Sequence, residues 1–258
     1  MESSTIMQTK PLRRSRGPCL IVAAALCAGA GRAEAFDVDD RRALWFVVND
    51  LCRPMQRLLG SPRPCLKVDL AHGFVVLRAP GETTQVLIAP TARIAGIESP
   101  AILKEGAPNL WALAWAERNR VAASAPRPLQ WDDVGMAVNS RLGRSQDQLH
   151  IHVDCVDARL KRALAAHAFR PTPNWAPLDP GPWGNRYRVK YIAAAGLEKN
   201  IFKMVAEEIP GAKARMARQA IAVVGVGAKD DRGFAVLASS EGGGHAEELL
   251  DHACAPGK

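Results

Sequence analysis

The chain has 258 residues, of which 48% are hydrophobic, 23% are charged and 18 are proline. This composition excludes fibrous, collagenous and disordered proteins and leaves one large domain or two small ones. The formal net charge is +8, but residues 1–35 hold five basic and two acidic residues, so the rest carries +5. Such a diffuse surplus argues against nucleic acid as a partner and suits phosphorylated small molecules or anionic membrane surfaces.

The N-terminus predicts an export signal. A basic cluster precedes an apolar run over residues 19–30, which ends just before Ala33-Glu34-Ala35. This order is typical of a secretory signal peptide that is cut after Ala35. The run is shorter than the roughly 20 apolar residues of a membrane-spanning helix, although an uncleaved anchor is the alternative. We therefore expect an exported protein, in the periplasm or on the periplasmic face of the inner membrane.

The cysteines agree with export. Two of the six lie in the signal, and the mature chain keeps Cys52, Cys65, Cys155 and Cys254. An even number in an oxidising compartment predicts disulfides, and free buried thiols are the alternative. Cys52 and Cys65 flank a Pro-rich stretch, so a local bridge is the simplest of the three connectivities. Cys155 would then pair with Cys254.

The mature chain is expected to begin with a helix over residues 41–53 and a Pro-rich connection over residues 54–71. Two β-rich runs follow, residues 72–78 and 84–90. The turn signal Pro80-Gly81 lies between them, which predicts a hairpin.

A second group of elements completes the order β-β-α-β-β-α. Helical spacing of apolar residues predicts an amphipathic helix over residues 109–124, with Asn109 as its N-cap. Residues 134–140 and 148–156 are expected strands, and Asp157 caps a helix over residues 157–168.

The C-terminal part has a similar order of strands and helices, but its sequence patterns are weaker. Five prolines make residues 170–184 the expected linker between a catalytic half, residues 36–169, and a second half, residues 185–258. The elements expected there are a strand over 185–193, a helix over 199–218, and strands over 220–226 and 234–239. A duplicated fold is one expectation for this arrangement.

Polar chemistry gathers between residues 139 and 155. Side chains alternate along a strand, so Gln148, His150, His152 and Asp154 share one face while the residues between them enter the core. Imidazole is largely unprotonated near neutral pH and attacks phosphorus well. The pair of histidines therefore predicts a nucleophile with a second imidazole beside it.

The loop before these histidines predicts an anion site. Asn139, Ser145 and Gln146 offer amide and hydroxyl groups, while Arg141 and Arg144 are expected to clamp a pyrophosphate. Exposed arginines that serve only solubility are the alternative. A metal pair is another interpretation of His-x-His, and Asp154 would then be the third ligand. We expect neither metal nor cofactor, because the sequence has no phosphate-binding Gly-Lys loop and no dinucleotide fingerprint.

Several separated segments resemble one family. His-x-His within paired strands and helices resembles the histidine triad superfamily, and the segments together closely resemble bacterial CDP-diacylglycerol pyrophosphatase from about residue 44 to Cys254. The segments are Glu98-Ser-Pro-Ala-Ile-Leu, Asn109-Leu-Trp-Ala-Leu-Ala-Trp-Ala-Glu-Arg118, Val138-Asn-Ser-Arg-Leu-Gly-Arg-Ser-Gln146, His150-Ile-His-Val-Asp-Cys155, Ala206-Glu-Glu-Ile-Pro210 and Asp251-His-Ala-Cys254.

The resemblance implies an α+β fold in which helices pack on a HIT-like antiparallel sheet. In one version of this fold, two tandem HIT-like halves would form a pseudo-dimer within the chain. It implies hydrolysis of CDP-diacylglycerol to CMP and phosphatidate at a phospholipid membrane surface. His150 would form a cytidylyl intermediate, and His152 would contact the α-phosphate. Asn139 and Ser145 match residues that position the phosphate and the nucleophile.

The chain departs from the triad pattern at one position. Gln148 stands where the pattern has its first histidine, and its amide is expected to support the nucleophile by hydrogen bonding. Two other functions stay open from the sequence: hydrolysis of soluble nucleotide pyrophosphates, and binding of a nucleotide or lipid without catalysis. The sequence does not predict the oligomeric state.

Overall fold

A computed structural model describes residues 40–166, 170–179, 181, 186–227, 231–241 and 244–255. The predicted signal peptide, residues 1–35, lies outside these residues. The chain from Val38 to Lys258 forms one compact unit, to which every element below belongs.

The first helix is longer than the sequence predicts. It consists of four helical segments that follow one another without a break: η1 (Asp40–Arg42), α1 (Ala43–Phe46), η2 (Val47–Cys52) and α2 (Arg53–Leu59). Pro54 lies in the first turn of α2, just after the π-helical segment η2, and the helix continues past it, so the helix does not end at residue 53 as predicted. It ends at Gly60, whose φ of 64° is left-handed and favours glycine.

Within the described residues, ten strands form a single sheet whose pairings are all antiparallel, so the predicted α+β class is confirmed. Along the sheet the order is β1-β2-β3-β5-β4-β8-β9-β7-β6, with β10 paired to β5. The strands are β1 (Lys67–Asp69), β2 (Phe74–Arg78), β3 (Val86–Pro90), β4 (Val134–Val138), β5 (Ile151–Val156), β6 (Ala176–Pro177), β7 (Arg188–Ala193), β8 (Ala220–Val226), β9 (Gly233–Ser239) and β10 (Leu250–Asp251).

The expected hairpin is present, since β2 pairs with β3. Two short strands lie in stretches predicted to be connections: β1 lies within residues 54–71, and β6 pairs with β7 from within residues 170–184. Because β4 pairs with β8, both predicted halves of the chain share one sheet.

The predicted helix caps are confirmed. The Asn109 side chain accepts a hydrogen bond from the backbone of Ala112, and Asp157 accepts one from Arg159. The predicted helix over residues 199–218 is broken after Glu208, where Pro210 and Gly211 interrupt it. The helical elements are η3 (Pro100–Leu103), α3 (Leu110–Ala116), α4 (Asn119–Ala122), η4 (Trp131–Asp133), α5 (Ala158–Ala165), η5 (Ala194–Glu198), α6 (Ile201–Glu208), η6 (Lys213–Arg218) and η7 (Ala246–Leu249).

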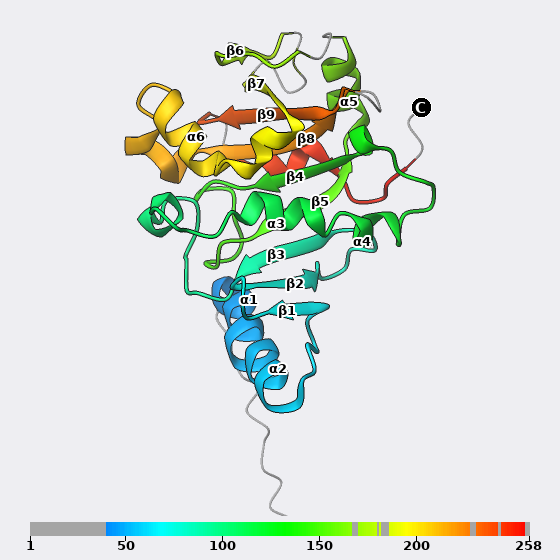
Figure 1. Cartoon of the computed structure of the whole chain (residues 1–258), viewed down its shortest axis with the longest axis vertical. Helices are drawn as coiled ribbons and strands as arrows, with labels where there is room; N and C mark the ends of the chain where they lie inside the picture. Colours follow the sequence, from blue (N-terminus) through cyan, green and yellow to red (C-terminus); the bar gives the residue numbers. More distant parts are fainter. Residues whose placement is uncertain are drawn as a thin grey trace, which may run out of the picture. The chain divides into compact units, whose positions relative to one another are not determined.

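The two faces of the sheet carry different covers. On one face α3 and α6 lie over the central strands (Figure 1), and their apolar side chains pack with those of the strands in one core. On the other face, α1 and η2 cover β2 and β3, while α5 and η7 cover the strands on the far side of β5. Among the described residues, no helix has the length and apolar character needed to cross a membrane.

Candidate functional site

His152 lies on β5 and His150 lies just before it, on the sheet face away from α3 and α6. Ile151 and Val153 enter the core beneath α3, as the alternation predicts. His152 lies on the other face, opposite Leu87 of β3 and Ala137 of β4. His150 and His152 are 7% and 6% exposed, and their ring centroids are 4.7 Å apart. The paired strands therefore fix two neighbouring imidazoles in a largely buried place.

The ring of His150 is held in one tautomer. Its Nδ1 lies 2.7 Å from the backbone oxygen of Gln148, and because a carbonyl only accepts, Nδ1 must carry the proton. Nε2 is then left with its lone pair. Burial, and to a smaller extent the neighbouring His152, together lower the pKa of His150 to about 4, against the opposing effect of the hydrogen bond to Gln148. His150 is therefore neutral and nucleophilic near neutral pH.

His152 is paired with a carboxylate from the C-terminal region. Its Nδ1 lies 3.0 Å from Oε1 of Glu247, which is an ion-pair contact without hydrogen-bond geometry, and its Nε2 is buried with no polar partner among the described residues. Buried polar atoms are normally satisfied, so an orphaned nitrogen beside a nucleophile points to a ligand contact.

Asn139 fixes the position of that carboxylate. Its Nδ2 donates to Oε2 of Glu247 at 3.1 Å, and its Oδ1 accepts from the Glu247 backbone at 3.0 Å. Burial alone would raise the pKa of Glu247, but the contacts with His152, Gln85 and Asn139 hold it well below its ordinary value. Glu247 is therefore ionised beside His152.

A further layer surrounds Glu247. The amide of Gln85 donates to Oε1 of Glu247 at 3.1 Å and lies 2.9 Å from Nδ1 of His252. That Nδ1 is also 3.0 Å from Oδ2 of the buried Asp154. The hydrogen bond with Asp154 raises the pKa of His252, against the opposing effect of burial.

Both predicted disulfides are present, Cys52 with Cys65 and Cys155 with Cys254. The second one, together with the pairing of β10 to β5, ties the C-terminal segment to the strand that carries the histidines. This attachment is what brings Glu247 and His252 to the site.

A cavity of about 560 Å³ opens over the histidines. Its polar lining includes the predicted residues Ser145 and Gln146 together with His150, His152 and Glu247. An apolar wall comes from the first helix, β2, β3 and the loops beside them: Ala43, Leu44, Val47, Pro64, Leu77, Ala79, Pro80 and Leu87. Arg78, Glu82 and Gln85 add polar groups to the lining. The cavity thus joins a polar reactive end to an apolar wall.

The two predicted glutamines hold neighbouring parts of the chain in place. The Gln148 amide donates to the backbone oxygens of Pro90 and Ala92, both at 2.9 Å, so it secures the chain that follows β3. Gln146 also accepts a hydrogen bond from the Leu44 backbone at 2.8 Å, which attaches the loop to α1.

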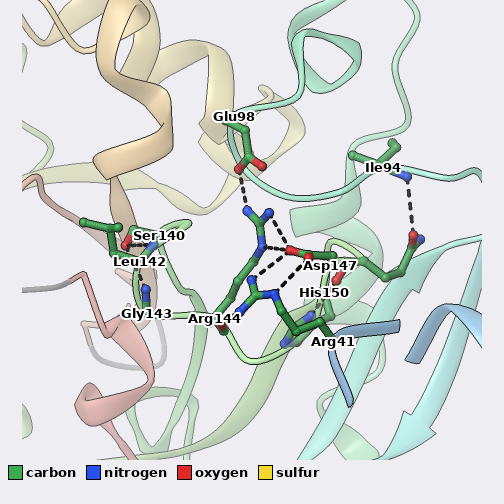
Figure 2. Close-up of polar contacts among 10 residues, drawn as sticks. Arg41, Ile94, Glu98, Ser140, Leu142, Gly143, Arg144, Asp147 and His150 are labelled. Atoms are coloured by element: carbon green, nitrogen blue, oxygen red, sulfur yellow. Dashed lines mark hydrogen bonds and ion pairs between the residues drawn. The ribbon is translucent and has the colours of Figure 1, made fainter. Parts of the chain in front are cut away.

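The buried side chain of Arg144 forms ion pairs with the partly exposed Glu98 and Asp147, and Arg41 binds the same Asp147 (Figure 2). A Cβ at residue 96 would lie 2.0 Å from a guanidinium nitrogen of Arg144, so this close packing requires Gly96. Arg144 and Arg141 line a neighbouring cleft and not the cavity of His150.

One group of potential metal ligands occurs in the part of the chain that the structure describes. Among the described residues, Asp154, Cys155 and Cys254 bring potential ligand atoms close together, but the two sulfurs are bonded to each other. A disulfide sulfur is not a thiolate and does not serve as a metal ligand of the usual kind.

The sequence-based reasoning missed Glu247, Gln85 and His252. None of them lies in the His-x-His segment, and each reaches the site from another part of the chain. The available signal was the pairing of Cys155 with Cys254, because it predicted that residues near Cys254 lie beside β5.

Two comparisons with known proteins point to one family. The model of the family described as CDP-diacylglycerol pyrophosphatase matches residues 39–258. A protein of Yersinia pestis named CDP-diacylglycerol pyrophosphatase is 38% identical over 218 residues, which cover 82% of this chain and 83% of that protein.

Proposed function

The chain belongs to the CDP-diacylglycerol pyrophosphatase family, and we propose that it hydrolyses its substrate through a covalent cytidylyl-His150 intermediate. As a CDP-diacylglycerol diphosphatase it releases CMP and phosphatidate. The observation that carries the proposed route is the hydrogen bond from Nδ1 of His150 to the Gln148 backbone oxygen. It leaves the unprotonated Nε2 of a cavity-lining histidine to attack phosphorus.

In the first step, Nε2 of His150 attacks the phosphorus that carries cytidine. A nitrogen–phosphorus bond forms while the bond from that phosphorus to the bridging oxygen breaks, and phosphatidate leaves with the electron pair. The Nδ1 proton stays on the ring, where the Gln148 oxygen stabilises the positive charge that develops. Phosphatidate leaves as an anion, so the step needs charge stabilisation more than an acid.

In the second step, water attacks the cytidylyl phosphorus and the nitrogen–phosphorus bond breaks, which releases CMP and restores His150. His152 and Glu247 are the pair that accepts the proton of water, because the Glu247 carboxylate stabilises the imidazolium that forms. Asn139 is a positioning residue in this scheme, since it acts through Glu247.

The loop residues divide into two roles. Ser145 lines the cavity, which supports a contact between its hydroxyl and a phosphate oxygen. Gln146, Gln148 and Arg144 hold the loop and its neighbours in place through the bonds described above. A pyrophosphate clamp by Arg141 stays a prediction that binding measurements with Arg141→Gln would test.

The strand connections support a HIT-like pseudo-dimer. In the first half, β3 leads through α3 to β4 and then β5, and the three strands lie in the order β4-β5-β3. In the second half, β7 leads through α6 to β8 and then β9, in the equivalent order β8-β9-β7. Antiparallel pairing of β4 with β8 joins the halves, and β9 contains no histidine, whereas His150 and His152 lie at the start of β5. Only the first half would be catalytic.

In this proposal the protein is exported and acts in the periplasm or on the periplasmic face of the inner membrane. Two disulfides are typical of proteins in oxidising compartments, which agrees with the signal peptide predicted over residues 1–35. Because the substrate is a lipid, the enzyme would act on it at a phospholipid surface.

The test is CMP release from CDP-diacylglycerol in detergent micelles by residues 36–258 and by the His150→Ala variant, with excess chelator. The parent should release CMP without metal, and the variant should lose at least about a thousandfold in rate. A water-soluble CDP ester measured in parallel separates lipid from soluble substrates. Binding of substrate without turnover by the parent would instead favour the binding-protein alternative.

A further inference from the structure

An apolar surface lies at the end of the first helix, outside the catalytic cavity. We propose that this surface, the docking tip formed by Met55, Leu58, Leu59 and Leu66, inserts into an anionic phospholipid membrane and delivers the lipid substrate to the cavity. Leu58 and Leu59 are 81% and 68% exposed. Adjacent exposed leucines at a helix end are unusual in a soluble surface and mark a site of interaction. The proposal rests on the function proposed above.

The docking tip is connected to the cavity by apolar residues. Val47 lines the cavity, and Leu51 and Met55 follow it along the helix at intervals of four residues. Side chains at this spacing lie on one side of a helix. Pro64 also lines the cavity, and the loop that contains it is bonded to the helix through the Cys52–Cys65 disulfide. An acyl chain that leaves the reactive end can therefore follow one apolar path toward the tip.

The charges around the docking tip favour an anionic lipid surface. Residues 51–68 contain four basic residues and no aspartate or glutamate. Arg57 and Arg63 are exposed, and neither forms an ion pair with any described residue. Basic residues beside exposed leucines and a methionine are typical of segments that lie in a membrane interface.

A second copy of the chain is a poorer occupant of this surface. A symmetric contact through Leu58 and Leu59 would bring two sets of unpaired arginines together, and like charges at an interface oppose association. The substrate itself also favours a bilayer, because its two acyl chains place it there.

Vesicle co-sedimentation tests the proposal with a chain begun at residue 36. The sheet, its apolar cores and both disulfides all lie within residues 40–255, and this chain excludes the apolar run of residues 19–30. The probes are vesicles of phosphatidylcholine with and without phosphatidylglycerol, free of substrate. The variants are Leu58→Ser with Leu59→Ser, Arg57→Gln with Arg63→Gln, and the control Leu142→Ser, whose leucine is 71% exposed but lies between β4 and β5.

The parent should bind the anionic vesicles, and the double leucine variant should bind at least about tenfold more weakly. The arginine variant should lose binding to anionic vesicles only, and Leu142→Ser should bind as the parent does. Failure of the parent to bind, or equal loss in Leu142→Ser, would overturn the proposal. A parent dimer that Leu58→Ser with Leu59→Ser converts to a monomer would also overturn it, since the surface would then bind a second copy.

Turnover separates this proposal from the function on which it rests. On long-chain CDP-diacylglycerol in vesicles, the double leucine variant should fall about tenfold relative to the parent. On a short-chain ester dispersed as monomers, the two proteins should be equal. If the parent hydrolyses neither substrate, the proposed function fails, while the vesicle measurement still reports on the docking tip.

Discussion

Nδ1 of His152 lies 3.0 Å from Oε1 of Glu247, although one residue comes from a central strand and the other from η7 near the C-terminus. Asn139 holds the other carboxylate oxygen and the Glu247 backbone together. A segment near the C-terminus, η7, therefore completes the catalytic face of β5.

Glu247→Gln should lower the rate of CMP release by about ten- to a hundredfold, because His152 loses the charge that stabilises its imidazolium. Steady-state kinetics on micellar substrate measures this effect. Glu248→Gln is the matched control, since Glu248 binds Arg186 and Tyr187 and does not line the cavity. Equal rates for Glu247→Gln and the parent would remove Glu247 from the mechanism.

The pH dependence should reflect the low pKa of His150. With a pKa of about 4 in the folded enzyme, the nucleophile stays neutral through the weakly acidic range. We expect the acid limb of kcat/KM near pH 4, below the ordinary histidine value of about 6.5. An acid limb near pH 6.5 that is assigned to His150 by NMR titration would contradict this assignment.

Folding stability should respond to the same group. The unfolded chain binds a proton on His150 at a pH where the folded chain does not, so stability falls as pH decreases from about 6.5 toward about 4. Between pH 7 and pH 5 the parent should lose about 2 kcal/mol more than His150→Gln does. Urea unfolding at the two pH values gives this difference, and equal losses would show that the folded pKa is not lowered.

Removal of each disulfide should destabilise the protein by a different amount. The Cys155–Cys254 bridge closes a separation of 99 residues and the Cys52–Cys65 bridge one of 13. In the chain-entropy model the corresponding double serine variants lose about 5 and about 3 kcal/mol. Only the Cys155→Ser, Cys254→Ser variant should also lose activity while folded, because it releases the segment that carries Glu247. Full activity of the folded variant would contradict that role.

Arg144→Gln should lower the free energy of unfolding by about 3 kcal/mol, since the side chain is only 5% exposed and its loss leaves the Glu98 carboxylate without this partner. Denaturant unfolding measures the change. Arg141→Gln is the control from the same loop, because Arg141 is exposed and should change stability by less than about 0.5 kcal/mol. Similar losses in both variants would mean that the Glu98 pair is not what stabilises the loop.

The sequence predicted well what depends on local pattern. Alternation along residues 148–156 placed Ile151 and Val153 in the core and His150 and His152 on the opposite face, because the period of a strand is a property of the backbone. Caps at Asn109 and Asp157 were predictable for the same reason, since a side chain satisfies the N–H groups of its own helix.

Contacts between distant segments were not predictable in the same way. Arg144 had the chemistry of a phosphate clamp, but the fold brings Glu98 and Asp147 to it and satisfies its charge within the protein. Glu247 had no local signature, because its role depends on β10 pairing with β5. Pro54 suggested the end of a helix, yet a proline in the first turn of α2 leaves the helix intact.

Trapping of the covalent intermediate tests the central claim most directly. Residues 36–258 would be mixed with CDP-diacylglycerol labelled at the cytidine-bearing phosphorus, quenched with alkali within one turnover, and digested for mass spectrometry. We predict an acid-labile label attached to the peptide that contains His150, absent from His150→Ala and present in Glu248→Gln. Full single-turnover CMP release with no labelled protein at any quench time, or a label retained by His150→Ala, would contradict a cytidylyl-His150 route.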